Sequence, residues 1–271
     1  MKDSRIARHG LVLLGCGKMG SAMLSGWLES GLPVSSVSVI DPAPSDWLKS
    51  TGVGLNTQLP ENPAVVLVAV KPQMMSDALP VLKAMGNGTT LFVSVAAGIT
   101  LHNFESVLGE MTPMVRAMPN TPAAIGRGIT AIVGNAAAGP EYLQEAKSLL
   151  EAVGEVITVT DETQIDAVTG VSGSGPAYVF HLIETMAAAG EAEGLDPAVA
   201  LQLAKVTVAG AGALAMAAEE NPAQLRVNVT SPNGTTQAAL EVLMDAETGF
   251  PALLGRAVKA ATDRARELAD G

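Results

Sequence analysis

The chain has 271 residues, of which 48% are hydrophobic and 3% aromatic, and its formal net charge at pH 7 is -11. A chain of this length can bury a large core, and the composition is that of a globular protein packed mainly by aliphatic side chains. The acidic balance and the scattered basic residues argue against nucleic-acid binding. Cys16 is the only cysteine in the sequence, so no intramolecular disulfide can form, which suits a reducing cytoplasm.

Neither the first residues nor the longest apolar stretch of the sequence predicts a membrane protein. Residues 1–10 carry scattered charges and lack the apolar core of a signal peptide. The longest apolar stretch, Val206–Ala218, is shorter than the ~20 residues that cross a bilayer. It is rich in Ala and Gly, so we expect a buried helix and no membrane partner.

The first predicted strand, Leu11–Leu14, runs into a glycine turn that opens a helix. The turn, Gly15-Cys16-Gly17-Lys18-Met19-Gly20, has the spacing of the dinucleotide-binding fingerprint. Gly15 permits the tight turn, Gly17 lets a pyrophosphate approach the backbone, and Gly20 lets the helix pack close to the strand. The open N–H groups at the helix start would then face the phosphates. An ordinary glycine turn is the alternative.

An acidic residue follows the second predicted strand, Val37–Ile40. Asp41 comes about 20 residues after Gly20, the spacing at which this fold places an acid on the adenosine ribose. Its charge would repel a 2′-phosphate and thus favours NAD(H). The sequence has no arginine nearby, and only Ser45 and Lys49 could assist a phosphate.

Short β-branched runs alternate with helical segments over roughly the first 160 residues, which predicts a doubly wound parallel sheet. The remaining predicted strands are Ala64–Val70, Thr90–Val95, Met114–Ala117, Ile129–Val133 and Val156–Thr160. After Asp161 the strand patterns stop and helical patterns follow. We therefore expect an α/β nucleotide-binding domain over residues 1–161 and an all-helical domain over residues 162–271.

Two strand ends are further candidates for cofactor binding, because ligands of open α/β sheets lie beyond the carboxyl ends of the strands. Ala69-Val70-Lys71-Pro72 is expected near the adenosine and its diphosphate, with a solvated loop lysine as the alternative for Lys71. The small residues Ala96 and Ala97 would leave room for a nicotinamide, although a plain tight turn explains them equally well.

The helical half contains two kinds of informative feature. Pro176 and Pro197 fit first-turn positions, with Ser174 and Asp196 as caps. Runs of small residues, such as those in residues 209–213, permit close approach of helices. We expect this half to pair with a second copy of itself.

A turn at Thr230–Thr236 leads into a clear helical pattern. Helix starts carry unpaired N–H groups and a partial positive charge. The amides of Gly234, Thr235 and Thr236 could therefore hold a small carboxylate, and Thr236 adds a hydroxyl group. Simple N-capping is the alternative.

The three histidines are isolated in the sequence, and the spacings HxH, HExxH and CxxC do not occur. We therefore expect no catalytic metal. The sequence also lacks GxSxG and P-loop patterns, so serine-type hydrolysis and phosphoryl transfer lack their parts.

Taken in order, these motifs make the chain resemble the pyrroline-5-carboxylate reductases over nearly its whole length. The features that carry the resemblance are GxGxMG at Gly15–Gly20, Ala69–Pro72, SxAAG at Ser94–Gly98, MPNTP at Met118–Pro122, DAVTGxSGSGPAY at Asp166–Tyr178 and QLRxxVTSPxGTT at Gln224–Thr236. The last two are highly specific.

The resemblance implies reduction of L-1-pyrroline-5-carboxylate to L-proline with NADPH or NADH. It also implies a Rossmann-like N-terminal domain and a helical dimerisation domain, in dimers that often assemble further into decamers. Its site residues would be Thr236, hydrogen-bonded to the ring nitrogen, a clamp at Gly234–Thr236 with Asn228 and Val229 nearby, the acids Glu219 and Glu162, and Asn56 at the adenosine ribose.

Two other functions remain open. A reductase of the β-hydroxyacid dehydrogenase type should carry a catalytic lysine shortly after a glycine motif in its helical domain. The next lysine after Gly175 is Lys205, about 30 residues on, which counts against it. A non-catalytic dinucleotide sensor would not need the conformationally strict turn at residues 231–236.

Overall fold

The computed structural model describes residues 4–270, with only the backbone of residue 270. The outermost residues of the two predicted domains, 1–3 and 271, lie outside the described residues. Contacts divide the chain into two compact units: the first ends at Gly173 and takes in the stretch from Ala261 onward, and the second is Ser174–Ala260. The first unit thus extends beyond the predicted boundary at residue 161, because Ile165 is fully buried in its core.

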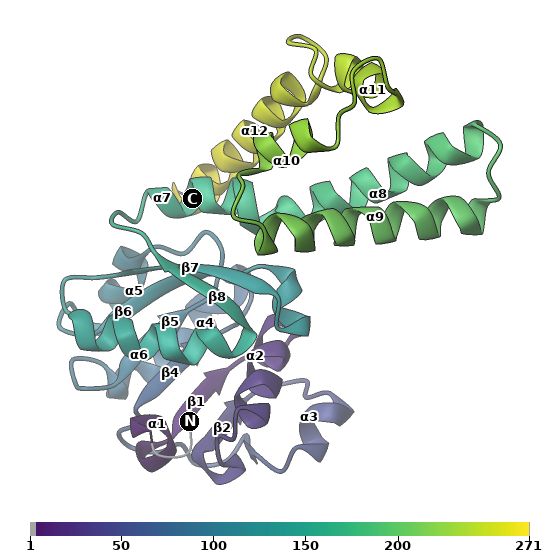
Figure 1. Ribbon diagram of the computed structural model, residues 1–271. Helices are drawn as coiled ribbons and strands as arrows, with labels where there is room; N and C mark the ends of the chain where they lie inside the picture. The colour runs from purple at the N-terminus through teal and green to yellow at the C-terminus, as the bar shows by residue number, and fades with distance from the viewer. Residues whose placement is uncertain (1–3, 271) are drawn as a thin grey trace. The chain divides into compact units, whose positions relative to one another are not determined.

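The first unit is built on one sheet of eight strands in the order β3-β2-β1-β4-β5-β6-β7-β8 (Figure 1). The strands are β1 Leu11–Leu14, β2 Val37–Ile40, β3 Gly54–Leu55, β4 Val65–Val68, β5 Leu91–Ser94, β6 Met114–Met118, β7 Gly128–Gly134 and β8 Gly154–Thr158. Each predicted strand has a counterpart here, with ends shifted by up to two residues. The two-residue β3 was not predicted.

The sheet is not parallel throughout, which corrects the expectation from the sequence. β7 pairs with β6 in the antiparallel sense, whereas the other neighbouring strands pair in parallel. Residues 119–127 join β6 to β7 and contain only the 3₁₀ turn η4, Thr121–Ile125. A parallel crossover needs roughly a dozen residues or more, so this connection is too short for one.

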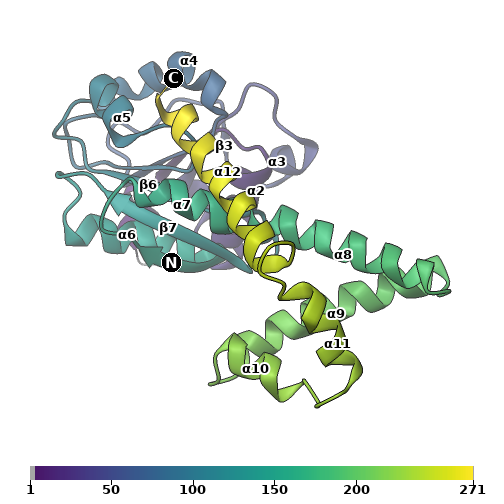
Figure 2. The ribbon, with the colours of Figure 1, turned by 90° about the horizontal axis from the view of Figure 1, so that it is seen from above.

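Helices cover both faces of the sheet (Figure 2). The helices of this unit are α1 Arg5–His9, α2 Lys18–Glu29, α3 Asp46–Ser50, α4 Met75–Ala78, α5 Leu101–Leu108, α6 Pro140–Leu150 and α7 Gln164–Val168. Shorter turns are η1 Val34–Ser36, η2 Pro72–Met74, η3 Leu79–Met85, η5 Glu151–Val153 and the π-turn η6 Thr169–Gly173.

Strand residues alternate between the two faces of the sheet, as the pleat requires. Leu11 and Leu13 of β1 belong to the cluster that contains α2 and α6, whereas Val12 and Leu14 belong to the cluster that contains α4 and α5. All four are buried, which explains why β1 is apolar at every position.

The second unit is helical, as predicted. Its helices are α8 Gly175–Ala192, α9 Pro197–Ala217, α10 Pro222–Asn228, α11 Thr235–Leu243 and the start of α12 Phe250–Asp270, whose C-terminal part belongs to the first unit. α8 and α9 pack against each other (Figure 1). Asp196 caps α9 through the N–H groups of Ala198 and Val199, as predicted, whereas Ser174 stands at the N-cap of α8 without a side-chain cap.

α9 corrects the expectation of a buried apolar helix. It has 21 residues and is, by length and composition, able to cross a membrane, yet only 11% of its apolar window is buried in the chain. Its close contacts to α8 run through the small residues Ala187, Ala200 and Ala204. Larger apolar side chains on the helix, such as Val206 and Met216, stay exposed.

Candidate cofactor and substrate sites

The glycine turn between β1 and α2 has the conformation that the fingerprint requires. Gly15 has φ +87°, a conformation that costs other residues energy, and a Cβ there would meet the carbonyl oxygen of Ala69 at 2.9 Å. A Cβ at Gly20 would collide with the carbonyl oxygen of Gly15. At Gly17, in contrast, a Cβ would meet no described atom within 4 Å, so the backbone there is open to a ligand.

The start of α2 offers unpaired N–H groups at this opening. Gly17 is the N-cap, and no side chain in the described part of the chain caps the helix there. The first intrahelical bond runs from the N–H of Ser21 to the carbonyl of Gly17 (2.8 Å). The preceding amides and the exposed side chain of Lys18 can therefore meet an anion.

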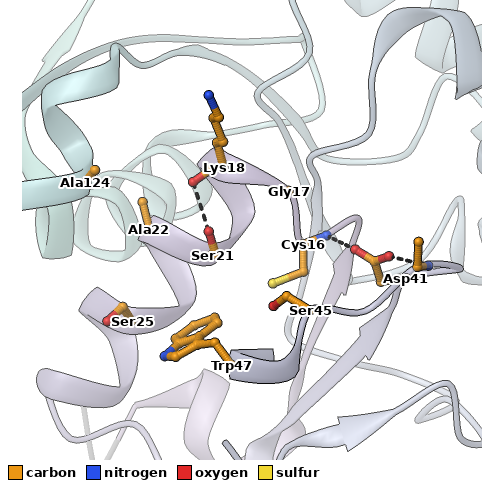
Figure 3. A pocket seen from close by; sticks show the side chains of 11 residues that line it. Cys16, Gly17, Lys18, Ser21, Ala22, Ser25, Asp41, Ser45, Trp47 and Ala124 are labelled. Atoms are coloured by element: carbon orange, nitrogen blue, oxygen red, sulfur yellow. Dashed lines mark hydrogen bonds between the residues drawn. The ribbon is translucent and has the colours of Figure 1, made fainter. Parts of the chain in front are cut away.

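A pocket of about 670 Å³ lies against this turn (Figure 3). Its lining comes from the turn, from one face of α2, from the end of β2 and from the start of α3, together with η4. The lining residues are Cys16, Gly17, Lys18, Ser21, Ala22, Ser25, Asp41, Ala43, Ser45, Trp47 and Ala124. Its size falls in the range of small-molecule sites.

Asp41 is fixed in this pocket by backbone amides. Its Oδ2 accepts a hydrogen bond from the N–H of Cys16 (2.8 Å), and its Oδ1 accepts one from the N–H of Ala43 (2.8 Å). A carboxylate has about four acceptor positions, so two remain for ligand hydroxyl groups. The carboxylate therefore ties the end of β2 to the glycine turn and still faces the pocket.

Asn56 holds Asp41 from the other side. Its side-chain Oδ1 accepts the N–H of Asp41 (2.9 Å), and its Nδ2 donates to the carbonyl of Asp41 (2.8 Å). The asparagine side chain thus pairs with the backbone of Asp41 in the manner of a further strand residue. Its contact with an adenosine ribose stays a prediction, and the structure shows it as a support for Asp41.

The buried thiol of Cys16 is held in its protonated form. Burial, and secondarily the nearby charge of Asp41, raises the pKa of Cys16 to about 11. A thiol in this state is a poor nucleophile, so the contribution of Cys16 to the pocket is its backbone N–H.

The other predicted cofactor residues lie at the ends of β4 and β5 but outside the lining of this pocket. Ala69 packs in the core, while Lys71 is the exposed N-cap of η2, which begins at Pro72. Ala96 is buried, and Ala97 next to it is exposed. Their roles as contacts of the cofactor stay predictions, as do those of Met19 and Val70.

Several pocket residues were not among the predicted site residues. Ser21, Ala22 and Ser25 follow Lys18 at intervals of three and four along α2, so helical periodicity could have assigned them to the same face. Trp47 follows the end of β2 in the first turn of α3, next to the N-cap Ser45, which the sequence had suggested only as an aid to a phosphate. Ala124 comes from η4, which is far in sequence from the glycine turn, so no local pattern could assign it to the pocket.

In the second unit, the predicted carboxylate clamp is the start of α11. Gly234 is the N-cap, and no side chain of the described chain caps this helix. Simple N-capping by a Ser or Thr hydroxyl therefore does not explain the turn. The N–H of Gly234 donates to the carbonyl of Ser231 (3.0 Å), so within the predicted clamp the available amides are those of Thr235 and Thr236.

The turn before α11 is held in shape by local bonds. Asn233 has φ +57°, and its N–H donates to Oε1 of Gln237 (2.8 Å). Asn228 and Val229 end α10 just before this turn. Glu219 is exposed and lies before the start of α10.

Glu162 lies in the first unit, where it has protein partners. Its Oε1 accepts from Nη1 of Arg116 (2.7 Å) and from the N–H of Leu101 (2.8 Å). Arg116 is 4% exposed in the middle of β6 and needs this partner. The ion pair accounts for Glu162 without a substrate, and its substrate role stays a prediction.

Known proteins are similar to this chain over both of its units. The pyrroline-5-carboxylate reductase of Pseudomonas aeruginosa is 39% identical over 96% of this chain and 97% of its own length. That of Synechocystis is 41% identical over 95% and 97%. The chain belongs to the pyrroline-5-carboxylate reductase family.

The family assignment extends to the fold and to both units. The structure of a pyrroline-5-carboxylate reductase from Coxiella burnetii has 35% identity and a TM-score of 0.89, covering 96% of this chain and 98% of that one. A family model for pyrroline-5-carboxylate reductase dimerisation matches residues 162–268. One described as NADP oxidoreductase, coenzyme F420-dependent, matches residues 10–98.

Proposed function

We propose that this protein reduces L-1-pyrroline-5-carboxylate to L-proline with NADH or NADPH, the last step of proline biosynthesis. It is an oxidoreductase acting on a cyclic imine. The observations that carry the proposal, in a chain of this family, are the settings of two helix starts that lack side-chain caps. One opens onto the pocket at α2, and the other is at α11 behind a turn of fixed shape.

The residues at α2 fit a dinucleotide. The open backbone at Gly17 leaves room for a pyrophosphate, and the amides at the start of α2 can donate to it. Asp41 has two acceptor positions left for the ribose hydroxyl groups. A reduced nicotinamide, when bound, supplies the hydride for the reaction.

The residues at α11 fit the substrate carboxylate. The N–H groups of Thr235 and Thr236 lie at the positive end of the helix dipole, where an anion is stabilised. The hydroxyl of Thr236 can donate to or accept from the ring nitrogen. The chain thus contributes orientation, and holding two reactants in the reactive geometry can lower a barrier by up to roughly 7–11 kcal/mol.

The charge in the pocket bears on the choice between NADH and NADPH. Asp41 places a fixed carboxylate where a 2′-phosphate would lie, and the cations nearest in sequence are Lys18 and Lys49. Lys49 is paired with Asp46 (3.0 Å). This arrangement supports NADH, whereas the resemblance to the family supports NADPH, so we propose that the enzyme accepts both.

We further propose that the protein is a cytoplasmic homodimer. Exposed apolar side chains on α9 and the dimerisation family model at residues 162–268 support pairing through the helical unit. Pairing of this kind would cover the apolar face of α9 without a membrane. A pentamer of dimers is the proposed higher assembly.

The experiment is an absorbance assay at 340 nm with the purified protein, the imine substrate and each nicotinamide cofactor. Oxidation that requires the imine and yields L-proline supports the proposal. Tight cofactor binding without turnover would instead identify a sensor. Oxidation of a β-hydroxy acid without imine reduction would point to a dehydrogenase of the β-hydroxyacid type.

A further inference from the structure

One large aromatic side chain in the cofactor pocket has no role in the function described so far. Trp47 is 41% exposed and lines the pocket, whereas Trp27, the other tryptophan, is fully buried. The indole N–H of Trp27 donates to the carbonyl of Leu149 (2.9 Å), which accounts for it as a core residue. Trp47 has no comparable explanation in the core.

The backbone that carries Trp47 is fixed, although the indole itself is exposed. Ser45 caps α3 by accepting the N–H of Leu48 (3.1 Å), and Leu48 is 1% exposed in the core. The hydroxyl of Ser50 donates to the carbonyl of Trp47 (2.7 Å). These contacts hold the start of α3 in place, so the ring is presented to the pocket from a rigid support.

The indole lies on the side of the pocket that belongs to β2. It reaches from α3 toward the part of α2 that carries Ser25, with Ser45 and Cys16 nearby (Figure 3). In the sheet, β2 lies on one side of β1, whereas β4 and β5 lie on its other side. A dinucleotide with its pyrophosphate at the end of β1 would extend its adenine half past the end of β2, toward Trp47, and its nicotinamide half toward Ala96 at the end of β5.

We propose that the Trp47 indole is the platform on which the adenine ring of the cofactor stacks. Asp41 lines the same pocket, and in the proposed site its carboxylate would accept from the ribose hydroxyl groups, so the base attached to that ribose would lie toward the indole. Stacking on an aromatic ring suits any base and requires no hydrogen bonds from the protein. This inference rests on the proposed dinucleotide site and assigns the adenine half of it.

The test measures binding of the two halves of the cofactor separately, by calorimetry, with Trp47→Leu and Trp47→Phe variants. The probes are 5′-AMP, nicotinamide mononucleotide and NADH. We expect Trp47→Leu to bind 5′-AMP and NADH about tenfold more weakly and Trp47→Phe to retain most of the affinity, because base stacking on an aromatic ring contributes about this much. Affinity for nicotinamide mononucleotide should stay at the wild-type value.

Three results would overturn the inference. The first is wild-type affinity of Trp47→Leu for 5′-AMP. The second is an equal loss of 5′-AMP affinity in Trp47→Phe and Trp47→Leu, and the third is a loss of nicotinamide mononucleotide affinity in Trp47→Leu as large as its loss of 5′-AMP affinity. Thermal unfolding controls for folding, and the exposed position predicts an unchanged Tm. The 5′-AMP measurement needs no imine, so failure of the reductase proposal would show separately as absent turnover in the wild-type protein.

Discussion

Replacing Gly17 with valine tests the dinucleotide turn without disturbing the fold. The backbone at Gly17 has φ -71° and ψ -159°, an extended conformation that does not require glycine, and a Cβ there would meet no described atom within 4 Å. The new side chain would instead occupy the space in front of the open amides of α2. We therefore expect Gly17→Val to fold and to lose affinity for NADH and NADPH.

The size of the loss follows from the bonds that the pyrophosphate would forfeit. Hydrogen bonds to charged groups contribute about 1.5–3 kcal/mol each, so losing two costs about 3–6 kcal/mol. A tenfold change in Kd corresponds to about 1.4 kcal/mol, so Kd should rise at least about 100-fold. The cost in folding stability should be about 1 kcal/mol, the usual penalty of replacing a favoured N-cap residue with an apolar one.

Gly139 provides a matched control for this experiment. It is the N-cap of α6 with φ -62° and ψ 178°, and a Cβ there also meets no described atom within 4 Å. Gly139→Val should show a similar loss of stability in urea unfolding, with unchanged cofactor affinity in a fluorescence titration. Wild-type NADH affinity in Gly17→Val, or an equal affinity loss in Gly139→Val, would refute the assignment of this turn.

Three further predictions concern single side chains. Asp41→Ser should raise the ratio of kcat/KM for NADPH to kcat/KM for NADH by about tenfold, since it removes a charge beside the 2′ position. Asp41→Asn is a second uncharged variant, and an unchanged ratio in both would mean that the carboxylate does not contact the ribose. Thr236→Ala should lower kcat by more than it raises the Kd of NADH, and Thr236→Ser should restore turnover; equal activity of all three proteins would remove the hydroxyl from the mechanism. Burial raises the pKa of Cys16 from 9.0 to about 11, so alkylation of the thiol at pH 8 should be about 100-fold slower in the folded protein than in urea. The free energy of unfolding should also fall as pH rises from 9 toward 11, because the unfolded chain loses the thiol proton before the folded one does. Labelling at the same rate in both states would show that the thiol is not buried as described.

The sequence predicted the central strands because their burial on both faces leaves a continuous apolar run. It missed β3, since two residues, Gly54 and Leu55, form no pattern. The sequence also did not predict that β7 runs antiparallel to β6, because that direction depends on the short connection between the two strands and not on the residues within them. The exposure of α9 could not be read from its composition, because an apolar helix can be covered by its own chain or by another copy.

In the candidate sites, too, the sequence predicted local features but not contacts between distant segments. Spacing located the glycine turn and the start of α11, where local sequence determines the backbone. It could not show that Asp41 bonds to Cys16 and to Ala43, or that Glu162 pairs with Arg116, since these contacts depend on how strands are arranged in the sheet. The N–H of Gly234 was expected to be free and is used within the turn, a detail of geometry that residue types do not reveal.

The central claim is that the start of α11 holds the carboxylate of the substrate. A crystal structure of the protein with L-proline tests it most directly. We expect the carboxylate oxygens at about 2.7–3.2 Å from the backbone nitrogens of Thr235 and Thr236. Proline bound in the crystal with its carboxylate against other groups, and these two amides facing only water, would contradict the account.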